Sequence, residues 1–276
     1  MKILLVVYDN DSHMHNFPIG LGYLAAVMKI HDYEVQVYQQ DLHHYPEEHL
    51  TKYLDENHFD VVCLSMIGGY YQYEKNIKLS AAINRSKDRP FYIFGGHGPA
   101  GGPEFFLKKM DCDVIAIGEG ENTIINLLKA VENKQPLAEV KGIAFLDGGE
   151  LVETPKEPLI KDLDSIPFPA YDLFAMEYYR LLKSPNQRPS EFSMNFISSR
   201  GCIFTCNFCF RMDKGFRCRS PANVVEEIEL LKKDYGVTWI NFHDELLTSS
   251  EKRVTLLCEE FIRSNLNIKW TCNAHL

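Results

Sequence analysis

The chain has 276 residues, 45% of them hydrophobic and 24% charged, which is an ordinary globular composition and a length that favours two domains. Its formal net charge of -9 argues against a general role in nucleic-acid binding, because affinity for phosphate backbones needs a basic surface. No stretch approaches the roughly 18 apolar residues that span a bilayer, and the apolar N-terminal run lacks a signal-peptide cleavage site. We therefore expect a cytoplasmic protein with neither a nucleic-acid nor a membrane partner.

The first half of the chain alternates short apolar runs with amphipathic windows. Such alternation predicts a doubly wound, Rossmann-like α/β domain over residues 1–138, with a parallel sheet. Sheets of this kind bind ligands beyond the carboxyl ends of their strands. The expected strands are 2–7, 34–38, 61–66, 91–95 and 114–117, and the expected helices lie near 20–30, 47–57, 73–85, 103–109 and 122–131.

Residues 139–192 change character and are expected to form a hairpin followed by a linker. Asp147, Gly148 and Gly149 favour a hairpin turn. Pro167 and Pro169 disfavour helix and indicate an extended segment, with one short helix expected around 173–182.

The alternation of strand and helix returns over residues 193–276. Strands are expected at 194–198, 238–243 and 269–273, and helices at 221–235 and 250–265. Ser220 and Pro221 form an N-cap and first-turn pair that starts the first of these helices. Three βα units cannot close a barrel, so we expect the first half of one, with a C-terminal portion missing.

Three of the eight cysteines fall within eight residues, in the spacing C-x3-C-x2-C of Cys202, Cys206 and Cys209. In a long chain without an export signal, this pattern favours metal over disulfides. Three thiolates can bind three irons of a [4Fe–4S] cluster and leave the fourth iron open to another ligand. The alternative is a zinc site with Cys218 as its fourth ligand, although zinc loops usually use two C-x2-4-C pairs.

At this motif the sequence resembles the radical S-adenosylmethionine superfamily, in which an aromatic residue, here Phe208, precedes the last cysteine. The resemblance continues through 217–228, and it implies that Asp244 and Glu245 lie near the bound S-adenosylmethionine. Members often carry arginine where this chain has His275, so any role of that residue is open. The resemblance implies a partial (β/α)6 barrel and reductive cleavage of S-adenosylmethionine to a radical, with electrons from a donor such as flavodoxin or ferredoxin.

The front domain and the linker 164–171 resemble the cobalamin-binding class of this superfamily. Glycine clusters follow several predicted strands, where a corrin ring needs close approach of the backbone. Any doubly wound domain also needs tight turns there, so the clusters alone are weak evidence. The residues that this resemblance assigns to cobalamin are Pro18, Gly20, Gly22, Ser65, Gly95, Gly96, His97, Gly118, Glu119 and Gly120.

Whether a histidine of this chain binds cobalt on the lower face of the corrin ring is a separate question. Residues 11–16, with His13 and His15, partly match a D-x-H-x-x-G motif, but Asn16 replaces its glycine, and we expect base-off cobalamin and solvated histidines.

The resulting expectation is a cobalamin-dependent radical S-adenosylmethionine enzyme that transfers a methyl group to an unactivated carbon or phosphorus of a small-molecule substrate. Cyclisation or rearrangement, and a non-catalytic cobalamin-binding role, remain open. A methylthiotransferase-like protein would need three further cysteines in the front domain, which has only Cys63 and Cys112. No catalytic residue beyond the cofactor ligands is singled out.

Overall fold

The computed structural model describes residues 1–12, 16–183, 187–209 and 213–274. The chain divides into two compact units, and each unit consists of three segments that are separate in the sequence. The first unit comprises Met1–Ser12, Gly20–Leu159 and Pro169–Ala175, and the second comprises His13–Ile19, Ile160–Phe168 and Met176–Leu276. Each unit is described separately below.

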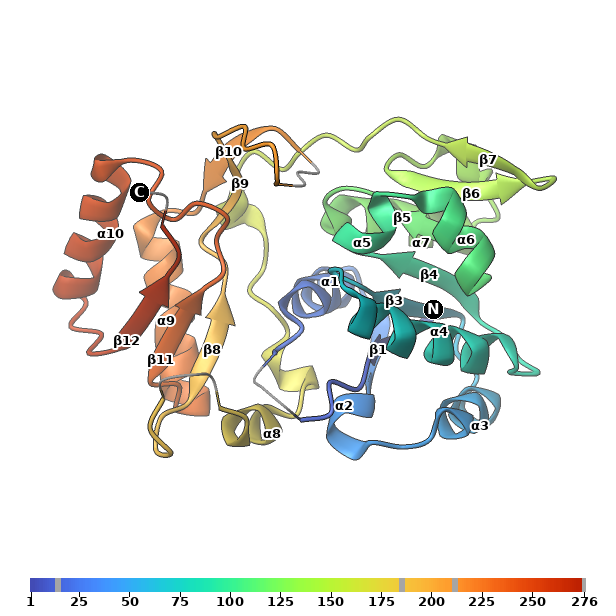
Figure 1. Ribbon diagram of the computed structural model, residues 1–276, viewed down its shortest axis with the longest axis horizontal. Helices are drawn as coiled ribbons and strands as arrows, with labels where there is room; N and C mark the ends of the chain where they lie inside the picture. Colours follow the sequence, from blue (N-terminus) through green and yellow to red (C-terminus); the bar gives the residue numbers. More distant parts are fainter. Residues whose placement is uncertain (13–15, 184–186, 210–212, 275–276) are drawn as a thin grey trace. The chain divides into compact units, whose positions relative to one another are not determined.

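A seven-stranded sheet forms the centre of the first unit, in the order β2-β1-β3-β4-β5-β6-β7 (Figure 1). The first five strands are parallel, so the predicted doubly wound sheet is confirmed. Their bounds are β1 (Lys2–Val7), β2 (Glu34–Gln39), β3 (Val61–Ser65), β4 (Phe91–Gly95) and β5 (Val114–Ala116).

The expected hairpin is present as β6 (Ile143–Asp147) and β7 (Glu150–Glu153), joined through Gly148 and Gly149 at positive φ. It was assigned to a separate connecting region, but it extends the sheet. β6 pairs antiparallel with β5, which would otherwise expose the backbone groups of an edge strand.

The helices of the first unit begin and end close to the expected positions, with two additions. The four-residue helices α2 (Gln40–His43) and α5 (His97–Ala100) are too short to give a periodic signal in the sequence. The longer helices are α1 (Ile19–Ile30), α3 (Glu47–Asn57), α4 (Tyr70–Asn84), α6 (Pro103–Met110) and α7 (Gly120–Glu132), and one 3-10 turn covers Leu137–Glu139.

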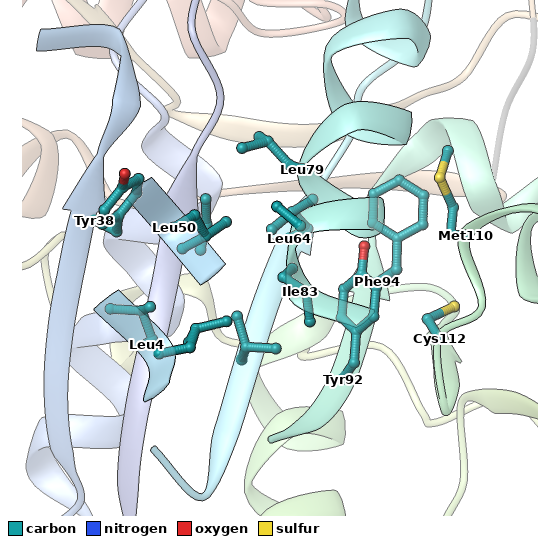
Figure 2. Packing of buried hydrophobic residues seen from close by; sticks show 14 of the residues in the cluster. Leu4, Tyr38, Leu50, Leu64, Leu79, Ile83, Tyr92, Phe94, Met110 and Cys112 are labelled. Atoms are coloured by element: carbon teal, nitrogen blue, oxygen red, sulfur yellow. The ribbon is translucent and has the colours of Figure 1, made fainter. Parts of the chain in front are cut away.

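Helices α3, α4 and α6 share one face of the sheet. Figure 2 shows strand side chains such as Leu64 and Phe94 packed with Leu50, Ile83 and Met110 of these helices, and all of them are at least 98% buried. At about 1.5–3 kcal/mol for each fully buried large apolar side chain, this layer is a main source of stability. Alternate strand residues are equally buried on the opposite face, where α1 and α7 lie side by side at Leu24 and Gly120.

A three-stranded parallel sheet, in the order β12-β11-β8, forms the centre of the second unit. The strands are β8 (Ser193–Phe196), β11 (Trp239–Phe242) and β12 (Lys269–Cys272), with helices α9 (Pro221–Tyr235) and α10 (Glu251–Arg263) between them. The helix expected around 173–182 is α8 (Met176–Leu181), and short 3-10 turns cover Leu163–Ser165 and, in the first unit, Tyr171–Leu173. This arrangement agrees with the expected half-barrel.

A two-stranded antiparallel ribbon interrupts the βα alternation after β8. It consists of β9 (Ser199–Cys202) and β10 (Gly215–Cys218), and the sequence had not predicted either strand. We call these two strands and the loop between them the cysteine ribbon. Among the described residues, no helix combines the length and the apolar character that crossing a membrane requires.

Candidate functional site

The cysteine ribbon presents the three predicted cluster ligands. Cys202 is the last residue of β9 and pairs with Gly215 of β10, so the ribbon opens into its loop at this point. Cys206 and Cys209 lie in the loop, where the Cys209 backbone N–H donates to the Cys206 carbonyl oxygen at 3.3 Å. Cys202 and Cys206 are half-buried and Cys209 is exposed. The loop thus keeps three thiols accessible.

The donor chemistry of these residues fits an iron–sulfur cluster. Each of the three is a free thiol, and thiolates are the usual ligands of such clusters. Within residues 1–12, 16–183, 187–209 and 213–274, no three His, Cys, Asp or Glu side chains are gathered closely enough to hold a metal ion.

The pairing of β9 with β10 argues against Cys218 as the fourth ligand of a zinc site. Cys218 pairs with Ser199 at the closed end of the ribbon, whereas Cys202 pairs with Gly215 at the open end. Three residue steps separate the two cysteines along the ribbon, which is roughly 10 Å at strand spacing. Cys218 is therefore badly placed to complete a tetrahedral zinc site with the triad.

The residues expected near S-adenosylmethionine differ sharply in their surroundings. Phe208 is 84% exposed, so its ring is available to a ligand beside the loop. Glu245 is exposed, whereas its neighbour Asp244 is only 4% exposed. The carboxylate of Asp244 accepts hydrogen bonds from Ser198 and Ser199, which the sequence did not connect with it.

Polar side chains also line the sheet face of the second unit that α9 and α10 leave free. Asn195, Asn241 and Thr271 lie in one row across the three strands, and the Thr271 hydroxyl donates to Asn241 Oδ1 at 2.8 Å. His243 follows at the carboxyl end of β11, where loss of hydration lowers its pKa against the opposing charge of Asp244. The sequence signal available for this row was the alternation of apolar and polar residues over 240–243, which read Ile, Asn, Phe and His.

The carboxyl edge of the first sheet brings together several residues expected to bind cobalamin. Ser65 and Gly95 end the neighbouring strands β3 and β4 and pair directly with each other. Gly118 and Glu119 follow β5, and Gly20 opens α1 after β1. Because these strands are parallel, their carboxyl ends share one edge.

The glycines at this edge fall into two groups. A Cβ atom at Gly20, Gly68, Gly69 or Gly118 would meet no atom within 4 Å, so these positions border open space. We call these four residues the open glycines. Their backbones could be approached closely by a flat ligand, which is the arrangement that the fit of a corrin ring requires.

The second group is used for packing within the protein. A Cβ at Gly96 would collide with the Met66 carbonyl oxygen, and one at Gly120 would press on Leu24. Gly22 is buried, and its carbonyl accepts a hydrogen bond from the Ala170 N–H at 3.0 Å. For Gly96 and Gly120, the internal contacts alone explain the need for a small residue.

The remaining expected residues are placed as follows. His97 is exposed at the start of α5, and the Glu119 carbonyl accepts a bond from the Thr123 hydroxyl at 3.1 Å. Pro18 is grouped with the second unit. His13, His15 and His275 lie outside the described residues.

An ionic network follows β1, and sequence reasoning did not find it. Asp9 Oδ1 lies 2.8 Å from His44 Nδ1, and Asp11 accepts bonds from Lys75 and the Tyr71 hydroxyl, both at 2.6 Å. Burial, followed by the bond to Asp11, raises the pKa of Tyr71 to about 12. The network fixes residues 9–12 against α4 at the sheet edge.

Known proteins resemble this chain in both of its units. Residues 1–128 match the B12 binding domain family. The radical S-adenosylmethionine methyltransferase TsrM from Kitasatospora setae, with tryptophan and a cofactor analogue bound, superimposes with a TM-score of 0.77 at 20% identity, covering 96% of this chain and 52% of that chain. OxsB with aqua-cobalamin bound superimposes with a TM-score of 0.78 at 20% identity, covering 97% and 38%. The fold is therefore that of cobalamin-dependent radical S-adenosylmethionine enzymes.

Curated relatives match over most of the chain. An uncharacterized methyltransferase, PH0819, of Pyrococcus horikoshii is 28% identical over 100% of this chain and 60% of its own length. The anaerobic magnesium-protoporphyrin IX monomethyl ester cyclase of Rubrivivax gelatinosus is 31% identical over 94% of this chain and 47% of its own length. The chain thus spans less than two thirds of each of these relatives. Residues 1–128 thus form a B12-binding domain, and over most of its length the chain is similar in sequence and in fold to cobalamin-dependent radical S-adenosylmethionine enzymes.

Proposed function

We propose that this chain carries the cofactor-binding part of an enzyme that uses a [4Fe–4S] cluster, S-adenosylmethionine and cobalamin to transfer a methyl group to an unactivated carbon or phosphorus centre. The observation that supports it most is the cysteine ribbon, which leaves three free thiols on one loop directly after the first strand of a parallel half-barrel. Three protein ligands leave one iron of a cubane open.

Each unit has a distinct role in this proposal. Cys202, Cys206 and Cys209 would hold the cluster, and the exposed Phe208 ring would lie against S-adenosylmethionine. The open glycines and Ser65 would accept the corrin and its tail at the edge of the first sheet. When bound, the cluster and S-adenosylmethionine supply a radical and cobalamin supplies a transferable methyl group.

Methyl transfer is supported by the names of several relatives. Besides PH0819, the cytidylyl-2-hydroxyethylphosphonate methyltransferase of Streptomyces wedmorensis is 27% identical over 90% of this chain and 55% of its own length. A small-molecule substrate and an external electron donor, such as flavodoxin or ferredoxin, complete the proposal.

Cyclisation is the second candidate, because the two relatives that match 94% of this chain at 31% identity are both named as the anaerobic cyclase. The two reactions differ in the fate of the methyl group. The reduced protein can be incubated with hydroxocobalamin and methyl-labelled S-adenosylmethionine. Label recovered in the cobalamin fraction would support methyl transfer, and 5′-deoxyadenosine formed without that label would favour cyclisation.

The cluster assignment is tested by metal analysis of Cys206→Ala after anaerobic reconstitution. We expect the wild-type chain to hold about four irons and the variant to hold almost none, because two thiolates on one loop do not retain a cubane. Cys218→Ala is the matched control, since it removes an exposed thiol at the closed end of the same ribbon. Full iron content in Cys206→Ala, or its loss in Cys218→Ala, would refute the ligand assignment.

The cobalamin assignment is tested by Gly20→Leu. This change places a side chain into open space in the first turn of α1, so we expect the fold to survive and cobalamin affinity to fall at least about tenfold. Ile30→Leu, at the exposed far end of the same helix, is the control. Equilibrium binding of hydroxocobalamin measured by absorbance would show the difference, and equal affinity in both variants would contradict the proposed surface.

A further inference from the structure

The turn at residues 197–199 joins β8 to β9 and so sets the direction in which the cysteine ribbon leaves the sheet. Three charged side chains from different parts of the second unit hold it. Asp244 follows β11, Arg219 follows β10, and Arg253 lies in the first turn of α10. All three are more than 90% buried.

Asp244 binds the turn through both its backbone and its hydroxyl groups. The Ser198 N–H donates to the two carboxylate oxygens at 3.2 and 3.1 Å, and the Ser198 hydroxyl donates to Oδ1 at 2.7 Å. The Ser199 hydroxyl donates to the same oxygen. A buried carboxylate is stable only when such donors replace its hydration, so these bonds account for the burial of Asp244.

Arg253 completes the charge balance on the other side of Ser198. Its Nη2 donates to the Ser198 carbonyl oxygen at 3.1 Å and to the Ser198 hydroxyl at 2.8 Å. That hydroxyl therefore accepts from the guanidinium and donates to the carboxylate of Asp244. One serine side chain connects two buried and opposite charges.

Arg219 fixes the same turn from the β10 side. Its backbone N–H donates to the Ser198 carbonyl oxygen at 3.0 Å, and Nη1 donates to the Ile197 carbonyl oxygen at 3.1 Å. Its guanidinium lies 5.4 Å from the Phe168 ring centre and 5.2 Å from that of Phe196, and it forms an ion pair with Glu227. The base of the ribbon is thus held by hydrogen bonds with Asp244, Arg253 and Arg219.

We propose that Asp244 is a positioning residue for the cysteine ribbon and not a ligand of S-adenosylmethionine. Its carboxylate is committed to Ser198 and Ser199, three to four residues before Cys202, whereas Glu245 is the exposed carboxylate at this strand end. The inference rests on the proposed cluster site for its functional meaning. The structural part, that Asp244 orders the ribbon, holds for the chain without any cofactor.

The first test is hydrogen–deuterium exchange of the cofactor-free chain. In Asp244→Asn the Ser198 and Ser199 hydroxyls lose a charged acceptor, so we expect the amides of residues 198–202 to exchange about tenfold faster or more. Residues 1–159 should exchange as in the wild type. Asp234→Asn is the matched control, because it makes the same chemical change at an exposed position of α9. Unchanged exchange in Asp244→Asn would overturn the proposal.

The second test separates positioning from direct binding by electron paramagnetic resonance of the reduced, reconstituted chain. We expect Asp244→Asn to hold less iron and to show an altered spectrum without S-adenosylmethionine, while the remaining clusters still respond when it is added. We expect Glu245→Gln to keep the wild-type spectrum until S-adenosylmethionine is added. A wild-type spectrum in Asp244→Asn that no longer responds to S-adenosylmethionine would make Asp244 a ligand and sink the proposal.

Two further outcomes are distinguishable. If Asp244→Asn does not fold, Ser199→Ala removes one donor and leaves the carboxylate in place; it should accelerate exchange of 198–202 by a smaller factor, and unchanged exchange there would count against positioning. If the wild-type chain takes up no iron, the proposed function fails, while the exchange experiment still decides whether Asp244 orders the ribbon.

Discussion

At the scale of single residues, Gly201 determines how closely the two strands of the cysteine ribbon approach each other. Its φ is +82°, and a Cβ there would collide with the Gly215 carbonyl oxygen. A side chain would need to move backbone, not a flexible neighbour. Gly201 is therefore a structural requirement immediately before Cys202, the first of the proposed cluster ligands.

We expect Gly201→Ala to destabilise the second unit by about 1–3 kcal/mol through backbone strain, and to lower iron uptake. Urea unfolding followed by tryptophan fluorescence measures the first effect, because both tryptophans, Trp239 and Trp270, lie in this unit. Gly148→Ala is the control: it also has positive φ, at +57°, but a Cβ there meets nothing within 4 Å and it lies in the hairpin of the first unit. Equal iron uptake by Gly201→Ala and the wild type would contradict this account.

The cysteines of the chain differ in the expected reactivity of their thiols. Burial raises the pKa of Cys63 to about 12, and burial followed by the charge of Asp113 raises the pKa of Cys112 to about 12. We expect iodoacetamide at pH 8 to modify the exposed Cys209 and Cys218 in the native chain, and to reach Cys63 and Cys112 only after unfolding. Mass spectrometry of digested protein would show this, and early labelling of Cys63 would disagree with it.

Because of the same two thiols, the free energy of unfolding of the chain depends on pH in the alkaline range. Their pKa values in the folded state lie above the ordinary thiol value of 9.0, so above pH 9 the unfolded chain loses these protons first. Their contribution is complete below pH 9 and is lost as the pH rises from 9 toward 12. Urea midpoints should fall over this range, and less steeply in Cys63→Ala after correction for the lost packing of the sulfur atom.

Adjacent residues can have different roles that the sequence does not separate. Asp244 and Glu245 both end the second strand of the half-barrel and carry the same charge. Their difference comes from Ser198 and Ser199, which are distant in the chain and meet Asp244 only in the fold. By contrast, the spacing of the three cysteines is local, so the sequence alone predicts their placement on one loop.

At the scale of elements, the bounds of helices and strands were predicted most accurately where the local sequence pattern was strongest. β1, β4, α3 and α9 begin and end at the expected residues. The two strands are short apolar runs, and Ser220 with Pro221 marks the start of α9. The cysteine ribbon could not be predicted because Ser199–Cys202 and Gly215–Cys218 show no alternation of apolar and polar residues. Their strand structure depends on pairing across the loop.

The start of α9 provides an element-scale prediction. The Ser220 hydroxyl accepts a hydrogen bond from the Asn223 N–H at 3.2 Å, with Pro221 at the first helical position. Ser220→Ala should lower the free energy of unfolding of the second unit by about 1 kcal/mol, within a usual range of about 0.5–2 kcal/mol. Ser264→Ala, at the C-terminal end of α10, should change it by less than about 0.5 kcal/mol. Both are measured by urea unfolding with tryptophan fluorescence, and equal effects would argue against the cap.

At the scale of the whole molecule, the first unit is completed by a segment far along the chain. We call residues Pro169–Ala175 the returning segment. The Ala170 N–H donates to the Gly22 carbonyl oxygen at 3.0 Å, the Ala175 N–H donates to Gln39 Oε1 at 3.0 Å, and Lys29 bonds Asp172 at 2.7 Å. Composition suggested boundaries near 138 and 192, but composition carries no signal for such an exchange of segments.

We expect a fragment of residues 1–175 to be more stable than one of residues 1–159 by about 1–3 kcal/mol. Two backbone hydrogen bonds contribute about 1 kcal/mol each, and the exposed ion pair contributes little. Urea unfolding followed by far-ultraviolet circular dichroism is the suitable measurement, because the first unit contains no tryptophan. Identical midpoints would show that the returning segment adds nothing to stability.

The returning segment also has a consequence for synthesis on the ribosome. Although β1 to β7 have all been made by residue 153, the contacts of Ala170, Asp172 and Ala175 with this unit form only after residue 175 has left the exit tunnel. For a period during synthesis, the nascent sheet therefore lacks the hydrogen bonds that Gly22, Lys29 and Gln39 form with the returning segment. Translation speed over residues 154–175 becomes a variable that can affect the yield of correctly folded protein.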